Sequence, residues 1–344
     1  MATVGTMRQP RAMGRPDISN IIFFLLCAFV ALLLLFKAVT GPRFFFQIVV
    51  FGVSDGAIFA LVAIGYTMVY GIIELINFAH GDVFTLGAFF ALTLFGILGI
   101  DEGQPFTVVT AAILLGVFLV VMVLNGMVNV TIERIAYRPL RYAPKLAPLI
   151  TAIGMSFVLE GLMYIWRGPQ TIHFPDLLPG PRVSLGGVGI SFKDVFVVIV
   201  SVVLVSALTL FVGRTRLGKA MRATAQDRDA AQLMGIDINR TIAATFFIGA
   251  ALAGAGGIIW GLYFNNVSFD LGFRAGLIAF TAAVLGGIGN IQGAALGGLV
   301  IGVIASFSDG YVSPLWTPVV VFSILILVLV FRPTGILGMR VPEK

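Results

Sequence analysis

Long stretches without a charged residue dominate this sequence and limit what it can fold into. A helix that crosses a membrane needs roughly 20 mostly apolar residues, because hydrocarbon offers no water to its backbone polar groups. Only 11% of the 344 residues are charged, against about 25% in a typical soluble domain. The sequence therefore predicts an all-α polytopic membrane protein and excludes an ordinary soluble enzyme. The uncharged windows are 18–36, 56–73, 83–100, 103–132, 195–213, 241–269, 275–308 and 310–331.

The first window bears on the location of the N-terminus. Arg8, Arg11 and Arg15 precede it, as basic residues precede the apolar part of a secretory signal. The apolar run is longer than the roughly 7 to 15 residues of a signal peptide, and no small-x-small cleavage site follows it. We therefore expect an uncleaved first span, preceded by a basic cytoplasmic extension at residues 1–17.

Basic residues between the windows predict which loops face the cytoplasm. Counted from an inside N-terminus, the connection with Arg134, Arg138 and Arg141 falls inside, and so does the segment 214–240 with its six Lys and Arg residues. Both assignments agree with the excess of Lys and Arg in cytoplasmic loops. The net charge of +6 is thus explained by a membrane topology and gives no reason to expect nucleic-acid binding. The spans expected after the first are 46–72, 83–100, 106–131, 146–166 and 194–213.

The glycine-rich segment Gly286–Gly293 predicts a break within the window 275–308. A single span there would leave the basic C-terminal tail outside, whereas two crossings return the tail to the cytoplasm. Glycine destabilises a helix interior by about 1 kcal/mol and permits a tight turn. We therefore expect about ten membrane passages, with eight or nine as alternatives, in one transmembrane domain over residues 18–340 followed by a short tail at 341–344.

Glycines spaced by four residues favour close packing of helices. Small residues at this spacing let two backbones approach each other in a membrane, where no hydrophobic force drives association. Chance alone could produce some of these spacings, since the chain has 41 glycines. The groups concerned are Gly257 with Gly261, Gly298 with Gly302, and Gly289 with Gly293 and Gly297.

Few residues could support catalysis or bind a metal or cofactor. Cys27 is the only cysteine, and the two histidines, His80 and His173, lie in different loops without neighbouring ligands. The stretch Gly213–Lys219 fits a phosphate-binding loop, but Ala220 follows it where Ser or Thr would contact Mg²⁺. We predict no catalytic, metal or cofactor site, and any ATP and Mg²⁺ that drive transport would bind to another polypeptide.

Two polar interruptions of the apolar pattern are candidates for a solute pathway. The stretch Glu74–Asp82 brings acceptor side chains to the start of a helix, as the unwound helices of transporters do around a solute. A cytoplasmic turn is the alternative reading. The isolated acids Asp55 and Glu160 fit an ion pair or a hydrogen bond between helices better than a proton relay. The candidate pathway residues are Asn77, His80, Gly81 and Asp82, with Thr281, Gly286, Gly287 and Asn290 around the glycine-rich break.

The basic segment 216–237 has the pattern of two short helices. Ala220, Ala223 and Ala231, with Leu233 and Met234, give it a small apolar face. A solvated loop would not usually carry such a face, so we favour docking into a groove of a partner protein over a merely solvated loop. The candidate docking residues are Gly218, Ala220, Arg222, Ala223, Asp227, Ala230 and Gly235.

Six stretches in a fixed order carry a resemblance over residues 45–340. The chain resembles the H-type permease of bacterial branched-chain amino acid ABC importers. The sequence departs from the usual family pattern at Glu74, where glycine is common, and at Glu160, where a neutral residue is common. The matching stretches are Ala63–Ile73, Ile76–Gly81, Glu133–Pro139, Gly218–Gly235, Ala279–Gly289 and Arg332–Gly338.

This resemblance implies a subunit with no enzyme activity of its own in the inner membrane of a bacterium. It implies a fold of the type II importer class and the segment Gly218–Gly235 as the coupling loop. It also implies four kinds of partner: an M-type permease, two ABC ATPases that bind ATP and Mg²⁺, a periplasmic or lipid-anchored solute-binding protein, and the lipid bilayer. Urea, short amides or other amino acids are alternative solutes, and a secondary transporter driven by an ion gradient is the alternative from another class.

Overall fold

The computed structural model describes residues 32–338 except 75, 101, 104–105, 142, 145, 179, 181 and 333. Seven of the described helices are long and apolar enough to cross a membrane. Two further apolar helices are shorter. The long helices are α2 (Pro42–Ile73), α3 (Ala79–Ile97), α4 (Val108–Ile132), α5 (Leu146–Arg167), α6 (Phe192–Arg214), α9 (Ile238–Phe264) and α11 (Ile291–Tyr311), and the shorter two are α10 (Leu271–Gly286) and α12 (Thr317–Phe331).

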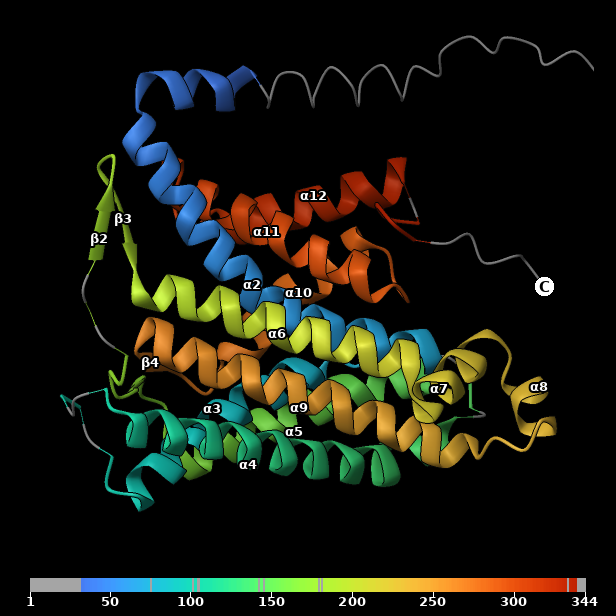
Figure 1. The fold of residues 1–344 in the computed structure, drawn as a ribbon. Helices are drawn as coiled ribbons and strands as arrows, with labels where there is room; N and C mark the ends of the chain where they lie inside the picture. The colour runs from blue at the N-terminus through green and yellow to red at the C-terminus, as the bar shows by residue number, and fades with distance from the viewer. Residues whose placement is uncertain are drawn as a thin grey trace, which may run out of the picture.

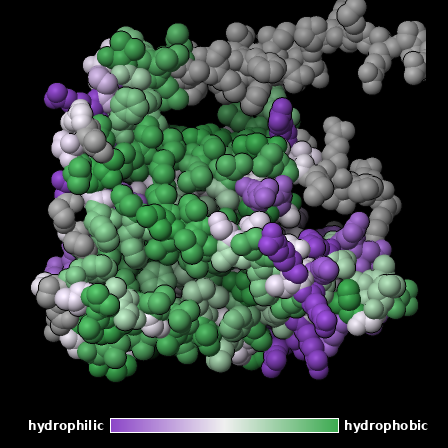
Figure 2. All heavy atoms as spheres, viewed as in Figure 1, coloured by the Kyte–Doolittle hydropathy of each residue, from purple (hydrophilic) through white to green (hydrophobic). Residues whose placement is uncertain are grey.

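The helices lie side by side with distinct structures at the two ends of the bundle (Figure 1). At one end lie the short helices α7 (Arg216–Gln226) and α8 (Arg228–Leu233). At the other end β2 (Arg182–Leu185) pairs with β3 (Val188–Ser191), and β1 (Ile172–His173) pairs with β4 (Asn266–Val267), both antiparallel. We call these the α7–α8 end and the hairpin end. Figure 2 shows apolar side chains over the visible sides of the helices and hydrophilic ones mainly at the ends.

Most predicted spans agree with the structure to within a few residues. The windows 46–72, 106–131, 146–166 and 194–213 correspond to α2, α4, α5 and α6. The span predicted at 83–100 begins earlier, because α3 starts at Ala79 and takes the polar stretch into its first turn. The predicted extension 1–17 and most of the first window lie outside the described residues, although residues 32–40 are helical.

The break predicted within the window 275–308 is present as a turn between α10 and α11. Gly287 and Gly289 have φ angles of 108° and 89°, a backbone region that favours glycine. Asn290 caps α11, since its side chain accepts hydrogen bonds from the backbone N–H groups of Gln292 and Gly293. The tail closes over this turn, where the N–H of Ile336 donates to Leu285 and that of Leu337 donates to Gly286.

Close glycine contacts hold the centre of the bundle around α2. A Cβ on Gly302 would lie 2.2 Å from the Cα of Gly56, and one on Gly298 would lie 2.4 Å from the Cα of Ala60. Backbones thus approach directly, as the four-residue glycine spacing predicts. Gly257, Gly261, Gly293 and Gly297 are also in close contacts, whereas Gly289 has open space around it and serves the turn instead.

Candidate functional site

A buried polar cluster surrounds the start of α3. Asn77, His80 and Asp82 are buried, and the hydroxyl of Tyr137 donates a hydrogen bond of 2.7 Å to Oδ1 of Asn77. The hydroxyl of Ser156 on α5 donates to Oδ2 of Asp82. Four of the predicted pathway residues therefore lie together inside the bundle and not in a cytoplasmic turn, namely Asn77, His80, Gly81 and Asp82.

The chain fits this cluster into the bundle through glycines on neighbouring helices. A Cβ on Gly65 of α2 would lie 2.2 Å from Nε2 of His80, and one on Gly81 would lie 2.2 Å from the carbonyl oxygen of Gly272. The ring of Tyr66 packs edge-on against His80 at 4.8 Å between centroids. Because Gly65 lies eight residues before the end of α2, the first turn of α3 begins roughly 12 Å inside the bundle.

Little space adjoins the cluster in this conformation. A cavity of about 10 Å³, lined by Thr67, Asn77 and Phe280 among others, lies beside it. This volume is about that of one water-sized probe. Within the described part of the chain, Nδ2 of Asn77 and Oγ1 of Thr67 are buried without a hydrogen-bond partner. Among the described residues, the cluster thus has polar capacity for a solute but little space for one beside it.

The second predicted pathway group surrounds the α10–α11 turn, which reaches the small cavity beside Asn77 through Ile288 and also has a structural role. Gly286, Gly287 and Asn290 form the turn between α10 and α11, where Nδ2 of Asn290 donates to the carbonyl oxygen of Leu337. A Cβ on Gly287 would lie 2.3 Å from the backbone nitrogen of Gly338, so this turn receives the tail. Thr281 is buried on α10 and donates to Leu277 of its own helix.

An open pocket of about 680 Å³ lies at the hairpin end. Residues of α2, α6, α9, α11 and the β2–β3 hairpin line it. Oδ2 of Asp55 accepts a hydrogen bond of 3.0 Å from Ser306, and Asp194 accepts from Ser54 and Tyr263. Asp55 stands out in the sequence as an isolated acid, but the pocket does not, because its residues come from five separate segments.

The segment 216–237, which the sequence predicts to be cytoplasmic, forms two short helices that share Asp227. This residue ends α7 and caps α8, since its side chain accepts from the backbone N–H groups of Asp229 and Ala230. Gly235 follows with a φ angle of 81°, which favours glycine. Arg228 donates two hydrogen bonds to the carbonyl oxygen of Ile72, so α8 is attached to the end of α2.

The docking residues predicted on this segment differ in exposure. Gly218 is buried, and a Cβ there would lie 2.3 Å from the carbonyl oxygen of Val212, so it contributes no surface. Arg222 is exposed and also donates to this carbonyl. Ala220 and Ala223 are half-buried, whereas Ala230 and Gly235 are exposed. The main apolar surface is the tip formed by Leu233 and Met234, which are 88% and 83% exposed.

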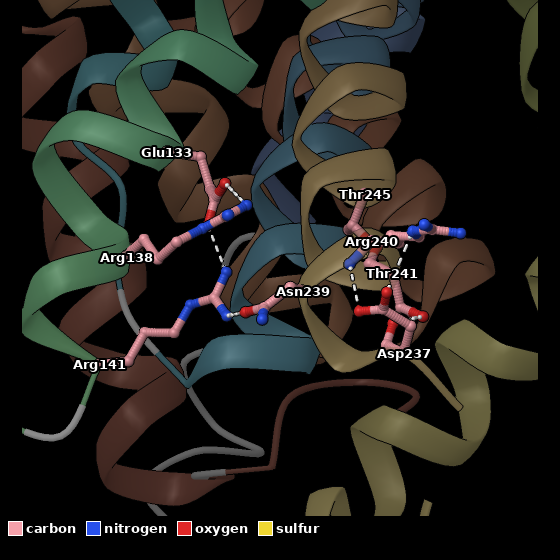
Figure 3. Close-up of polar contacts among 8 residues, drawn as sticks. All are labelled: Glu133, Arg138, Arg141, Asp237, Asn239, Arg240, Thr241 and Thr245. Atoms are coloured by element: carbon pink, nitrogen blue, oxygen red, sulfur yellow. Dashed lines mark hydrogen bonds and ion pairs between the residues drawn. The ribbon is translucent and has the colours of Figure 1, made fainter. Parts of the chain in front are cut away.

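A buried charge network joins α4 to α9 beside this segment. After α4 the chain continues through a π-helical turn, η1 (Glu133–Tyr137), and a 3₁₀ turn, η2 (Arg138–Leu140). Glu133 is 0% exposed and accepts from Arg138 at 2.9 Å and from Arg141 (Figure 3). Arg141 also donates to Oδ1 of Asn239 at 2.6 Å. Burial lowers the pKa of Arg141, and the carboxylate of Glu133 opposes this shift.

Residues 48–330 match the family described as "Branched-chain amino acid transport system / permease component". The chain belongs to this family. The permease is 44% identical over 307 residues to the high-affinity branched-chain amino acid permease protein BraD of Pseudomonas aeruginosa, covering 87% of this chain and 98% of BraD. It is 42% identical over 308 residues to LivH of Escherichia coli K12, covering 88% and 98%. A probable LivM of Methanocaldococcus jannaschii is 28% identical over 144 residues, covering 38% and 41%.

These relatives confirm the resemblance found in the sequence. The permease is a membrane-spanning subunit of an ABC importer, and its relatives are transport components and not enzymes. Sequence reasoning missed the pocket at the hairpin end and the Glu133 network. The stretch Glu133–Pro139 is one of the six matching stretches, but its pattern does not indicate that Glu133 is buried between two arginines.

Proposed function

We propose that the permease translocates branched-chain amino acids. The observation that carries this proposal is the 42–44% identity to LivH and BraD over nearly their whole lengths, since both are named as high-affinity branched-chain amino acid permeases. The weaker similarity to a LivM-type permease supports pairing with a second, M-type subunit of related sequence. Two ABC ATPases and a solute-binding protein complete the proposed importer, with ATP and Mg²⁺ bound by the ATPases.

The proposed topology has about ten passages in a type II importer arrangement. Nine apolar helices in the described part of the chain and the first window 18–36 support this number. The α7–α8 end faces the cytoplasm in this topology, because Arg134, Arg138 and the basic residues of α7 gather there. Both termini are then cytoplasmic, and the protein lies in the inner membrane of a bacterial cell.

The tip of α8 is the proposed contact with an ATPase. Leu233 and Met234 are exposed at the end of the bundle that faces water in this topology, where exposed apolar side chains indicate an interaction site. Ala230, Ala220 and Ala223 extend the same segment with small side chains. A groove on an ATPase subunit would cover this surface.

Movement of the tip would reach the buried polar cluster through two connections. Arg228 attaches α8 to Ile72 at the end of α2, and Asn239 attaches the start of α9 to Arg141 and the Glu133 network. Both α2 and α9 border α3, since Gly65 on α2 lies against the ring of His80 and Gly257 on α9 lies against the backbone of Phe84. Closure of the ATPases would therefore displace α2 and α9 and open the cluster around Asn77 to one side of the membrane at a time.

Purification of the permease from its native membrane in mild detergent tests this proposal. We expect an ATPase and a second permease to accompany the wild type, and Leu233→Asp to lose the ATPase and leucine uptake while the protein stays in the membrane. Val183→Asp is the matched control, since Val183 is 62% exposed at the hairpin end. Normal ATPase recovery and uptake in Leu233→Asp would refute docking at this tip. Gradient-driven uptake by the isolated chain would refute the importer assignment.

A further inference from the structure

The pocket at the hairpin end has the size and lining of a binding site for a small molecule. Its volume of about 680 Å³ falls within the roughly 300–1,000 Å³ typical of such sites. Phe51 of α2 and Phe264 of α9 form part of an apolar wall. Asp55, one turn beyond Phe51 on α2, and Ser306 of α11 add polar groups to the lining. The pocket thus combines hydrocarbon surface with charged groups.

Asp55 has unused hydrogen-bonding capacity. Its Oδ2 accepts from Ser306, whereas its Oδ1 is buried and has no hydrogen-bond partner in the described part of the chain. No described cation forms an ion pair with it. A buried acceptor without a partner costs about 1 to 3 kcal/mol, and more when the group is charged. A ligand that brings a positively charged donor would remove this cost.

Two further carboxylates favour a positive ligand group near Asp55. Asp194 and Asp309 lie close enough to interact electrostatically with Asp55. Both are occupied, because Asp194 accepts from Ser54 and Tyr263, and Asp309 accepts from Thr317. The described residues include no group of acids or histidines with the geometry of a metal site. The geometry therefore favours an organic ammonium group over a metal ion.

A cation on the hairpin complements these acids. Arg182 lines the pocket from β2, is exposed and makes no ion pair with any residue in the described ranges. Lys193, by contrast, pairs with Asp176 at 2.9 Å. The pocket therefore offers a free guanidinium, an apolar wall and a carboxylate with a free oxygen, which match the carboxylate, side chain and ammonium group of an aliphatic amino acid.

We propose that this pocket is an outer subsite that binds an aliphatic α-amino acid, with its ammonium group at Asp55 and its carboxylate at Arg182. The proposal rests on the proposed function, because it makes the transported solute the occupant of the pocket. It gives the permease its own recognition of a zwitterion, beyond any recognition by a solute-binding protein.

Protection of an engineered cysteine tests the subsite without requiring transport. Phe51→Cys is introduced together with Cys27→Ala, which removes the only native cysteine. The assembled importer, without its binding protein, is reconstituted in liposomes and labelled with a methanethiosulfonate reagent. We expect leucine at about ten times its dissociation constant to slow labelling roughly tenfold. The same concentration of 4-methylpentanoate, which lacks the ammonium group, should leave the rate nearly unchanged.

Asp55→Asn should abolish protection by leucine. Glu102→Gln is the control, because Glu102 is an exposed acid paired with His173 at the same end. In the Phe51→Cys protein that keeps Asp55, protection by 4-methylpentanoate equal to that by leucine would overturn the proposal. This comparison does not depend on whether Asp55→Asn folds. Unchanged protection in Asp55→Asn, or a cysteine that does not react in the assembled importer because another subunit covers the pocket, would also overturn it.

Leucine uptake by the same liposomes, with binding protein added, separates this proposal from the proposed function. Uptake without protection of the cysteine overturns the subsite alone. Failure to take up any branched-chain amino acid overturns the proposed function and, with it, the identity of the occupant.

Discussion

Two sets of ion pairs at the α7–α8 end, both drawn in Figure 3, differ in burial: those of Glu133, and that of Asp237 with Arg240. Glu133 is fully buried and accepts from Arg138 and Arg141, and Arg141 in turn donates to Asn239 of α9. The pair of Asp237 and Arg240 lies within the first turn of α9, and its side chains are 50% and 89% exposed. Similar ion pairs thus serve two purposes. The buried pairs hold Arg141 where it can bond Asn239 of another helix, whereas the exposed pair lies within the start of one helix. The comparison teaches that burial, and not the number of ion pairs, decides what a charge contributes.

Removing the buried carboxylate should have the largest effect. We expect Glu133→Ala to lower the free energy of unfolding by about 3–5 kcal/mol, because it leaves Arg141 partly buried without its charged partner. The midpoint of thermal unfolding of the purified permease measures this loss, and leucine uptake should fall with it. Glu102→Ala is the control, because it removes an exposed carboxylate at the opposite end. Equal midpoints for the two variants would contradict the role given to burial.

Changing the partly buried Arg141 should have an intermediate effect. Arg141→Ala removes donors to both Glu133 and Asn239, and hydrogen bonds to charged groups contribute about 1.5–3 kcal/mol. Arg141→Lys keeps the charge but lacks the planar fork that reaches two partners, so it should recover only part of the loss. Thermal unfolding ranks the three proteins. Full recovery in Arg141→Lys would show that charge alone matters here and that the link to Asn239 contributes nothing.

The buried hydrogen bond between Tyr137 and Asn77 extends the comparison to uncharged groups. Tyr137→Phe removes the hydrogen bond to Oδ1 of Asn77, and we expect a loss of about 1 kcal/mol in the free energy of unfolding. Asn77→Leu removes the same bond together with the polar group at the cluster. If Asn77 contacts the solute, only Asn77→Leu should change leucine uptake while ATPase association persists. Equal uptake in both variants would reduce Asn77 to a partner of Tyr137.

The sequence predicts those features that depend on local pattern. The apolar windows give most spans to within a few residues, and glycines 286–293 give the turn between α10 and α11. The alanine-rich segment gives α7 and α8. Each of these follows from length, charge or glycine content within one stretch of chain.

Features that depend on the packing of distant segments are not predictable in this way. His80 enters the bundle because Gly65, fifteen residues earlier on α2, leaves space for its ring, and hydropathy does not encode that contact. Gly218 fits the docking pattern but is buried against Val212. The pocket around Asp55 requires five segments to meet, and the burial of Glu133 requires α4 and α9 to pack together.

The exposed pair should show the smallest effect and so complete the ranking. Arg240→Ala removes an ion pair of 3.1 Å, but both side chains are solvated, and such pairs contribute about 0–1 kcal/mol. Asp237 keeps its capping bond from the backbone N–H of Arg240, which does not depend on the side chain. We therefore expect an unfolding midpoint and a leucine uptake close to those of the wild type, at low and at high salt. A fall in the midpoint comparable to that of Glu133→Ala would contradict the ranking by burial, whereas a loss of uptake at an unchanged midpoint would indicate that Arg240 contacts another subunit of the importer.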